Sequence, residues 1–262
     1  MEHPIFQKIE TSKKVDFGDI LTNSYNLFLK VWQQGAMHTL IMMLFVIPFI
    51  VLVYVPVIYM SYASNRYYDP YYYDYSPDYG MAGDNWLPFM IIYFIVLFVL
   101  IIIMQSVSLG VMAHFYKVCR IVDMETGEDE GGYFDYFKNG GFMKVFVLSL
   151  ATFGIAMAAI LLCYLPIFYV MVPLQLMLPI FAFNSKLSVS DIVKAAFKLG
   201  HKHWIYVFGL ILIAGNVAQL GILVCIIGII FTACIAYLPI YYFYKDTVGF
   251  DDAPVPETAL TE

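Results

Sequence analysis

Charged side chains are missing from four long stretches of this 262-residue chain, namely 31–65, 85–116, 145–185 and 203–244. About 20 apolar residues are enough for one helix to cross the hydrocarbon of a bilayer. Because a segment in lipid must satisfy its own backbone hydrogen bonds, these stretches predict helices rather than open sheet. The absence of charge therefore excludes a soluble globular domain and predicts an all-α, polytopic membrane protein.

Motifs that carry catalysis or metal binding are also missing. The four cysteines lie apart with no CxxC pair, which indicates neither a disulfide framework nor a zinc site. No nucleophile elbow, glycine-rich phosphate loop or HExxH sequence occurs. Because the charge-free stretches offer no carboxylate, proton-coupled transport through a buried acid and intramembrane proteolysis are disfavoured. We expect a protein that is not an enzyme and that binds no metal or cofactor.

Two charged segments resemble metal sites only in composition. The acidic run 123–130 lacks the spacing and central glycine of an EF-hand, so we interpret it as a solvated loop. In His201-Lys202-His203 the rings point to different faces of a helix, and we expect this segment to offer positive charge to anionic lipid. The formal net charge of −6 comes with no basic patch, so nucleic acid is not an expected partner.

Most residues of the chain are apolar. It is 61% hydrophobic with a mean hydropathy of +0.76, and only 13% of its residues are charged, against about 25% in an average soluble domain. Stretches 31–65 and 85–116 each fit one helix, whereas 145–185 and 203–244 are long enough for two. Turns are expected at 163–166, where a proline cannot continue a helix, and at the polar, glycine-bearing segment 216–221. This predicts six spans arranged as three hairpins.

Basic residues set the expected orientation. Of the 14 Lys and Arg residues, all except Arg66 fall on one side of the membrane under the six-span arrangement. Since cytoplasmic loops carry the excess of Lys and Arg, both chain ends are predicted to be cytoplasmic. No cleavable signal peptide is expected, because the first 35 residues are polar or amphipathic.

Segments outside the spans divide the chain further. Apolar residues recur at helical spacing in 17–31 and 188–200, which predicts two amphipathic helices lying on the cytoplasmic face. Ser188 and Asp191 have the spacing of a capping box at the start of the second. We expect a cytoplasmic amphipathic segment at 1–35, a membrane domain at 36–245 with an exterior tyrosine-rich loop at 61–85 and cytoplasmic loops at 117–143 and 185–203, and a disordered acidic tail at 246–262.

The two amphipathic segments also resemble each other. Trp32 and Trp204 occupy matching positions, as do Leu27 and Leu199, and a weaker third copy covers 132–144. The chain is therefore predicted to contain three units, each an interfacial helix followed by a hairpin of two spans. Repeats of this kind are common in transporters, although duplication alone does not establish transport.

Polar side chains inside the spans are the candidate functional residues. Gln105 and Ser108 lie one turn apart and are interpreted as hydrogen-bonding partners between helices in preference to a solute site. His38 and His114 lie near cytoplasmic span ends, where each is expected to be interfacial and not a ligand. The candidates for a site within the membrane are Gln105, Ser108, His114, Gln175, Asn216 and Gln219.

Several motifs resemble a broad group of bacterial integral membrane proteins, which includes the membrane domain of glycerophosphodiester phosphodiesterases and several uncharacterised six-helix families. The resemblance is carried by the opening 16–21 and, in the second half, by 179–183, 186–192, Trp204, 228–230 and 244–246. It implies a six-helix fold in a bacterial inner membrane. The soluble barrel of the phosphodiesterases is absent from this sequence, so their activity is not implied.

Two functions remain open. The first is a non-enzymatic membrane scaffold or accessory module that packs with lipid, a protein partner or further copies of itself. The alternative is a carrier or permease for a lipid or small uncharged solute, using the proline-bearing first and fourth spans around Gln105, Gln175 and Asn216. A retained protein partner favours the first, and a retained lipid or solute favours the second.

Overall fold

The structure, a computed structural model, describes residues 3–13, 15–67, 86–138, 140–162, 165–184, 186–224 and 226–250. Within these residues every regular element is a helix, which confirms the predicted all-α class. The tyrosine-rich loop from residue 68 onward and the tail from residue 251 lie outside the described residues.

In the part of the chain that the structure describes, five helices are long and apolar enough to cross a bilayer, so the chain is a membrane protein. They comprise the segments Phe17–Ile58 of α2 (Phe17–Tyr67), Met90–Met124 of α3 (Trp86–Met124), α4 (Gly141–Leu161), α5 (Leu165–Phe183) and Trp204–Leu223 of α7 (Trp204–Val224). At a rise of 1.5 Å per residue, the 19 to 21 residues of α4, α5 and α7 are about 30 Å long, which matches the hydrocarbon thickness.

The sixth apolar segment does not form a single helix. After α7 the chain continues through η2 (Ile226–Gly228), α8 (Ile229–Thr232), η3 (Ala233–Ala236) and α9 (Leu238–Thr247), which pack back against α7. The turn predicted at 216–221 is wrong, because these residues lie inside α7. At the actual turn Gly221 and Gly228 nearly touch, since a side chain at Gly221 would come within 2.7 Å of the Gly228 carbonyl oxygen.

The turn predicted at 163–166 coincides with the break between α4 and α5. Prolines elsewhere in the spans do not end a helix. Pro48 and Pro56 lie inside α2, and Pro173 and Pro179 lie inside α5, yet both helices continue through them. Proline therefore does not divide these spans.

Amphipathic segments pack on protein. The predicted helix at 17–31 is the first part of α2, continuous with the span, and its Ile20, Leu27 and Val31 are buried in the core. Helix α6 (Val189–Lys202) packs against α5, where Gly200 meets Pro173. The expectation that these apolar faces rest on the membrane surface is therefore wrong, because the protein's own helices cover them.

The start of α6 has the hydroxyl half of the predicted capping box, while the Asp191 carboxylate bonds to the Ser188 hydroxyl. The Ser188 hydroxyl accepts a hydrogen bond from the Asp191 backbone N–H at 3.2 Å and donates to its carboxylate at 2.6 Å. The third repeat copy, predicted at 132–144, is not an amphipathic helix, since its described residues form the short 3-10 turn η1 (Asp135–Phe137) and the first turn of α4. Two of the three predicted helices before the hairpins are therefore present.

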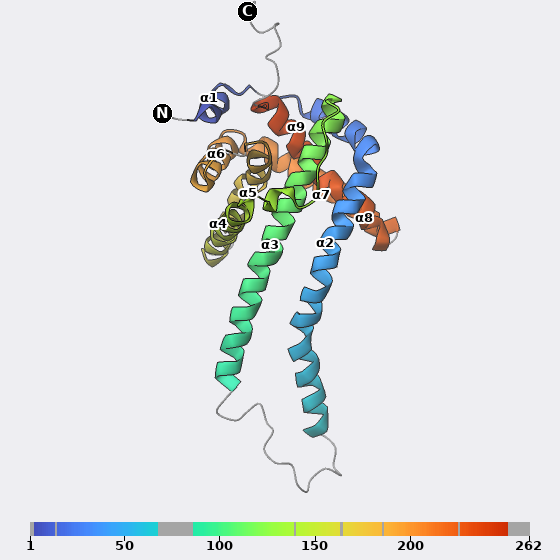
Figure 1. The fold of residues 1–262 in the computed structure, drawn as a ribbon, viewed down its shortest axis with the longest axis vertical. Helices are drawn as coiled ribbons and strands as arrows, with labels where there is room; N and C mark the ends of the chain where they lie inside the picture. The colour runs from blue at the N-terminus through green and yellow to red at the C-terminus, as the bar shows by residue number, and fades with distance from the viewer. Residues whose placement is uncertain are drawn as a thin grey trace, which may run out of the picture.

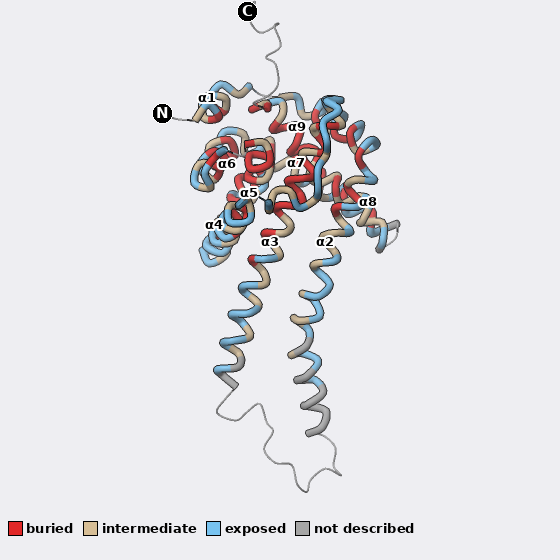
Figure 2. Tube along the Cα trace, viewed as in Figure 1, coloured by how far each residue is buried: buried red, intermediate tan, exposed pale blue. Residues whose placement is uncertain are grey.

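The core lies at one end of the molecule. Figure 1 shows α1 (Pro4–Thr11), α6 and α9 gathered at that end, while α2 and α3 run on together well beyond the other helices. In Figure 2 the buried residues concentrate in the gathered end. Residues 44–58 of α2 and 90–103 of α3, here called the stalk, expose mainly apolar side chains, among them Leu44 and Phe94. Such a surface is compatible with lipid, which competes for no hydrogen bonds.

Candidate functional site

A cavity of about 530 Å³ lies among α3, α4 and α5. Three of the polar residues singled out in the sequence, Gln105, Ser108 and Gln175, line it. Gln105 and Ser108 face it together because residues three apart share one side of a helix. The remaining wall is mostly apolar and is contributed by residues such as Leu109, Met112, Phe153, Ile167, Phe168, Met171 and Leu178.

Three of the polar side chains that line the cavity are available to bind a ligand. Gln105 and Gln175 are exposed to it, and among the described residues neither carboxamide has a hydrogen-bond partner. The same holds for the Ser108 hydroxyl. The interpretation of Gln105 and Ser108 as links between helices is therefore wrong for this structure. Thr152 on the opposite wall differs, because its hydroxyl already donates to the Leu148 carbonyl oxygen of its own helix at 2.8 Å.

Among the described residues no ionised side chain lines the cavity, and Tyr237 is the only titratable residue in that lining. An anionic headgroup or a cation would therefore lose its hydration without gaining a countercharge. A carboxamide can both donate and accept hydrogen bonds. The cavity is thus chemically suited to a neutral molecule with a large apolar part and a small polar group.

Asn216 and Gln219 are not part of this site. Both lie on α7 and are exposed, and the Asn216 side-chain amide donates to the Leu212 carbonyl oxygen of the same helix at 2.7 Å. The structure therefore does not bring Asn216 together with Gln105 and Gln175, although all three were expected to share a solute path.

His114 lies in a second cluster, together with His38. The two imidazoles are almost completely buried, at 2% and 0% exposure, and His38 Nε2 is 2.8 Å from His114 Nδ1. The expectation that each histidine meets headgroups in the interface is wrong, because both rings are buried within the protein. The loop after α3 covers them, since the Glu130 carbonyl oxygen is 3.1 Å from His114 Nε2 and the Tyr133 ring packs on both imidazoles.

A third cluster centres on Asp123 in the last turn of α3. Its carboxylate accepts hydrogen bonds from the hydroxyls of Tyr241 at 2.9 Å and Tyr242 at 2.6 Å, and it pairs with the Lys245 ammonium at 2.6 Å. The interpretation of Asp123 as part of a solvated loop is therefore wrong. The sequence contains one hint of this cluster. Several tyrosines precede Lys245, and on one short helix their hydroxyls can meet a common acceptor.

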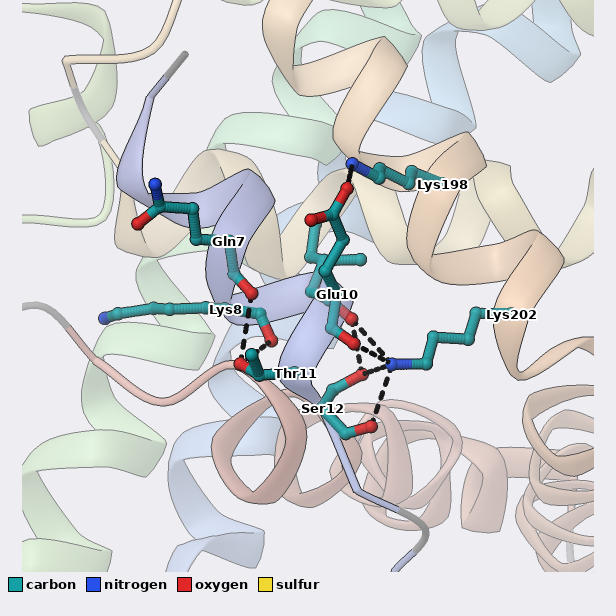
Figure 3. Close-up of polar contacts among 8 residues, drawn as sticks. Gln7, Lys8, Glu10, Thr11, Ser12, Lys198 and Lys202 are labelled. Carbon is teal, nitrogen blue, oxygen red and sulfur yellow. Dashed lines mark hydrogen bonds and ion pairs between the residues drawn. The ribbon is translucent and has the colours of Figure 1, made fainter.

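Basic residues of α6 hold the N-terminal helix α1. The Lys202 ammonium donates to the carbonyl oxygens of Ile9, Glu10 and Ser12 at 2.7 to 2.9 Å, as Figure 3 shows. These carbonyls lie at the end of α1, where backbone acceptors lack helical partners and a cation is favoured. The expected role of Lys202 in attracting anionic lipid is therefore replaced by a contact within the protein.

Side-chain pairs complete this contact. Lys198 forms an ion pair with Glu10, and its hydrogen bond and charge lower the pKa of that carboxyl below its usual value. His203 Nε2 lies 3.0 Å from the Ser12 hydroxyl, while His201 Nδ1 lies 3.1 Å from the Tyr169 hydroxyl. The two histidines of the HKH segment thus have different partners, and neither faces a cluster of metal-ligating residues in the described chain.

Comparison with known proteins gives no relative from which to transfer a function. No family model matches this chain, and neither a curated protein nor a solved structure matches it. The functional argument therefore depends on the geometry of the clusters described above.

Proposed function

We propose that this protein binds a neutral lipid or similarly apolar, uncharged molecule in the cavity among α3, α4 and α5, as a membrane carrier or permease. The observation that carries this proposal is the pair of carboxamides, Gln105 and Gln175, which have no hydrogen-bond partner among the described residues and lie in a mostly apolar cavity. Polar groups inside a membrane are costly, so groups kept without an internal partner are well placed for a ligand. The described lining carries no charged residue, which favours a ligand such as a diacylglycerol over a phospholipid headgroup.

The proposal includes a topology. The segment from η2 to α9 returns along α7 and serves as the sixth crossing, so that α2 with α3, α4 with α5, and α7 with this segment form three hairpins. Both termini are cytoplasmic, because nearly all Lys and Arg residues then lie on one side. The resemblance to six-helix bacterial proteins supports placement in a bacterial inner membrane.

A cavity-filling substitution tests ligand binding. Ala156 lines the cavity from α4, whereas Ala158 on the same helix is exposed and does not line it. Protein reconstituted in nanodiscs containing dioleoylglycerol should retain that lipid in native mass spectrometry. Ala156→Phe should abolish retention and Ala158→Phe should preserve it. Equal retention by both variants would contradict the proposal.

A scaffold or accessory module is the second candidate, and the stalk favours it. Its exposed apolar side chains extend along two helices that the other helices leave uncovered in the described structure. A partner's transmembrane helices would find a large complementary surface there. Affinity purification in mild detergent separates the candidates, because a stoichiometric protein partner without bound lipid supports the scaffold.

A further inference from the structure

Three polar contacts run in one line through the buried pair His38 and His114. His38 Nδ1 is 2.6 Å from the Gln34 carbonyl oxygen, and the two rings meet at 2.8 Å through His38 Nε2 and His114 Nδ1. His114 Nε2 then lies 3.1 Å from the Glu130 carbonyl oxygen. The line joins α2, α3 and the loop after α3.

The hydrogen-bond partners decide which ring nitrogens carry a proton. A carbonyl oxygen can only accept, so each outer ring nitrogen must carry a proton to make its hydrogen bond. A neutral imidazole has one N–H, and both protons are then used at the outer ends. The two inner nitrogens would face each other with lone pairs at 2.8 Å. One additional proton converts this contact into an N–H···N hydrogen bond.

We propose that His38 and His114 together form a binding site for a single proton, held between His38 Nε2 and His114 Nδ1. A second added proton is excluded, because every ring nitrogen would then carry hydrogen and two imidazolium ions would repel each other at contact distance. Proton binding strengthens the link between α2 and α3, since the inner hydrogen bond connects the two helices only while the proton is bound. This proposal is independent of ligand binding in the cavity.

The groups around the pair have mixed effects on a bound proton. The centroid of the Tyr133 ring lies 4.8 Å from that of His38 and 5.2 Å from that of His114. At these distances an aromatic ring can stabilise a cation. The Glu130 carboxylate, bonded to the Gln34 side chain at 3.1 Å, is favourable. Among the described residues, Asp135 on η1 also favours the proton, Lys117 on α3 opposes it, and Phe115, which packs on His38, is neutral.

Nitrogen NMR of the 262-residue protein tests this site without a substitution. The chain has five histidines, so ¹⁵N-histidine labelling in lipid nanodiscs yields few signals. On lowering the pH from about 8 to about 4, a range that covers histidine titration, both rings should change in one shared step with uptake of one proton. A coupling between His38 Nε2 and His114 Nδ1 should appear in that same step.

Substitutions provide the matched control. His114→Gln should remove the shared step from His38, whereas His201→Gln, which changes a ring outside the pair, should leave it intact. Two independent steps, two protons taken up by the pair, or no change at either ring across this range would each overturn the proposal. The wild-type spectrum decides the question even if His114→Gln fails to fold.

Discussion

The carboxylate of Asp123 lies 2.6 Å from the Lys245 ammonium, 122 residues later in the chain. This ion pair joins α9 to the last turn of α3, and the Asp123 side chain is only 12% exposed. The two tyrosine hydroxyls that also donate to it make Asp123 the acceptor for three groups of one short helix. Asp123 is therefore the point on α3 where three side chains of α9 meet, and Tyr116 of α3, stacked on Tyr241, adds a second contact between the two helices.

Asp123→Ala should lower the free energy of unfolding by about 3 kcal/mol, because it leaves a half-buried ammonium and two hydroxyls without their acceptor. Chemical unfolding in detergent, followed by tryptophan fluorescence, measures this change. Glu128→Ala is the control, since Glu128 is half-exposed and pairs with Arg120 at 3.3 Å. That surface pair should contribute less than about 1 kcal/mol. Equal losses in the two variants would contradict the assigned role of Asp123.

Replacing both cavity carboxamides, in Gln105→Leu with Gln175→Leu, should reduce dioleoylglycerol retention while leaving the melting temperature unchanged. No hydrogen bond within the protein is lost, whereas each bond to the ligand contributes about 1 kcal/mol, or about fivefold in affinity. Native mass spectrometry and thermal unfolding give the two readouts. Gln219→Leu on α7 is the matched control. A clear drop in melting temperature with unchanged retention would indicate that the carboxamides serve packing.

Lys202→Met should release α1 from α6, because the end of α1 loses the cation that its carbonyl oxygens share. The cost expected for such a helix-terminal contact is about 1 to 2 kcal/mol, enough to increase local opening. Limited proteolysis within residues 4–13 reports the release. Lys194→Met changes an exposed lysine of the same helix and should not alter cleavage. Unchanged cleavage in Lys202→Met would show that other contacts hold α1.

The Glu10 carboxyl should titrate below its ordinary range, because the hydrogen bond and charge of Lys198 lower its pKa. A folded-state pKa below the unfolded one means that the pair stabilises the docked helix above the unfolded pKa. This stabilisation is lost as the pH falls through the folded value. Carboxyl ¹³C NMR measures the midpoint, which should rise towards the ordinary value of a glutamate in Lys198→Met. A midpoint that does not move would contradict the ion pair.

Cysteine labelling tests the proposed orientation. In a variant without native cysteines, a single cysteine replacing Ser76 should react with an impermeant maleimide on intact cells whose outer envelope admits the reagent. A cysteine replacing Ser190, next to the start of α6, should react only after the inner membrane is opened. Labelling of the second site alone on intact cells would reverse the topology.

Part of the candidate site was visible in the sequence. Polar residues in a charge-free stretch are few, so Gln105, Ser108 and Gln175 were identifiable before their common cavity was known. Asn216 was equally conspicuous but lies on an outward face of α7, since sequence spacing fixes the relative positions of residues only within one helix. The pairing of His38 with His114 and the cluster at Asp123 connect residues from different helices, and no local pattern encodes such contacts.

The sequence by itself determined the class of protein and its main helices. Helices with almost no charge can be accommodated only in lipid, and the capping box at Ser188 depends on neighbouring residues alone. The tertiary structure decided which apolar faces meet protein instead of lipid, where the last segment breaks, and which polar groups gain partners. The physical reason is that membrane insertion depends on summed hydrophobicity along the chain, whereas burial and hydrogen bonding depend on how separate helices are placed in space.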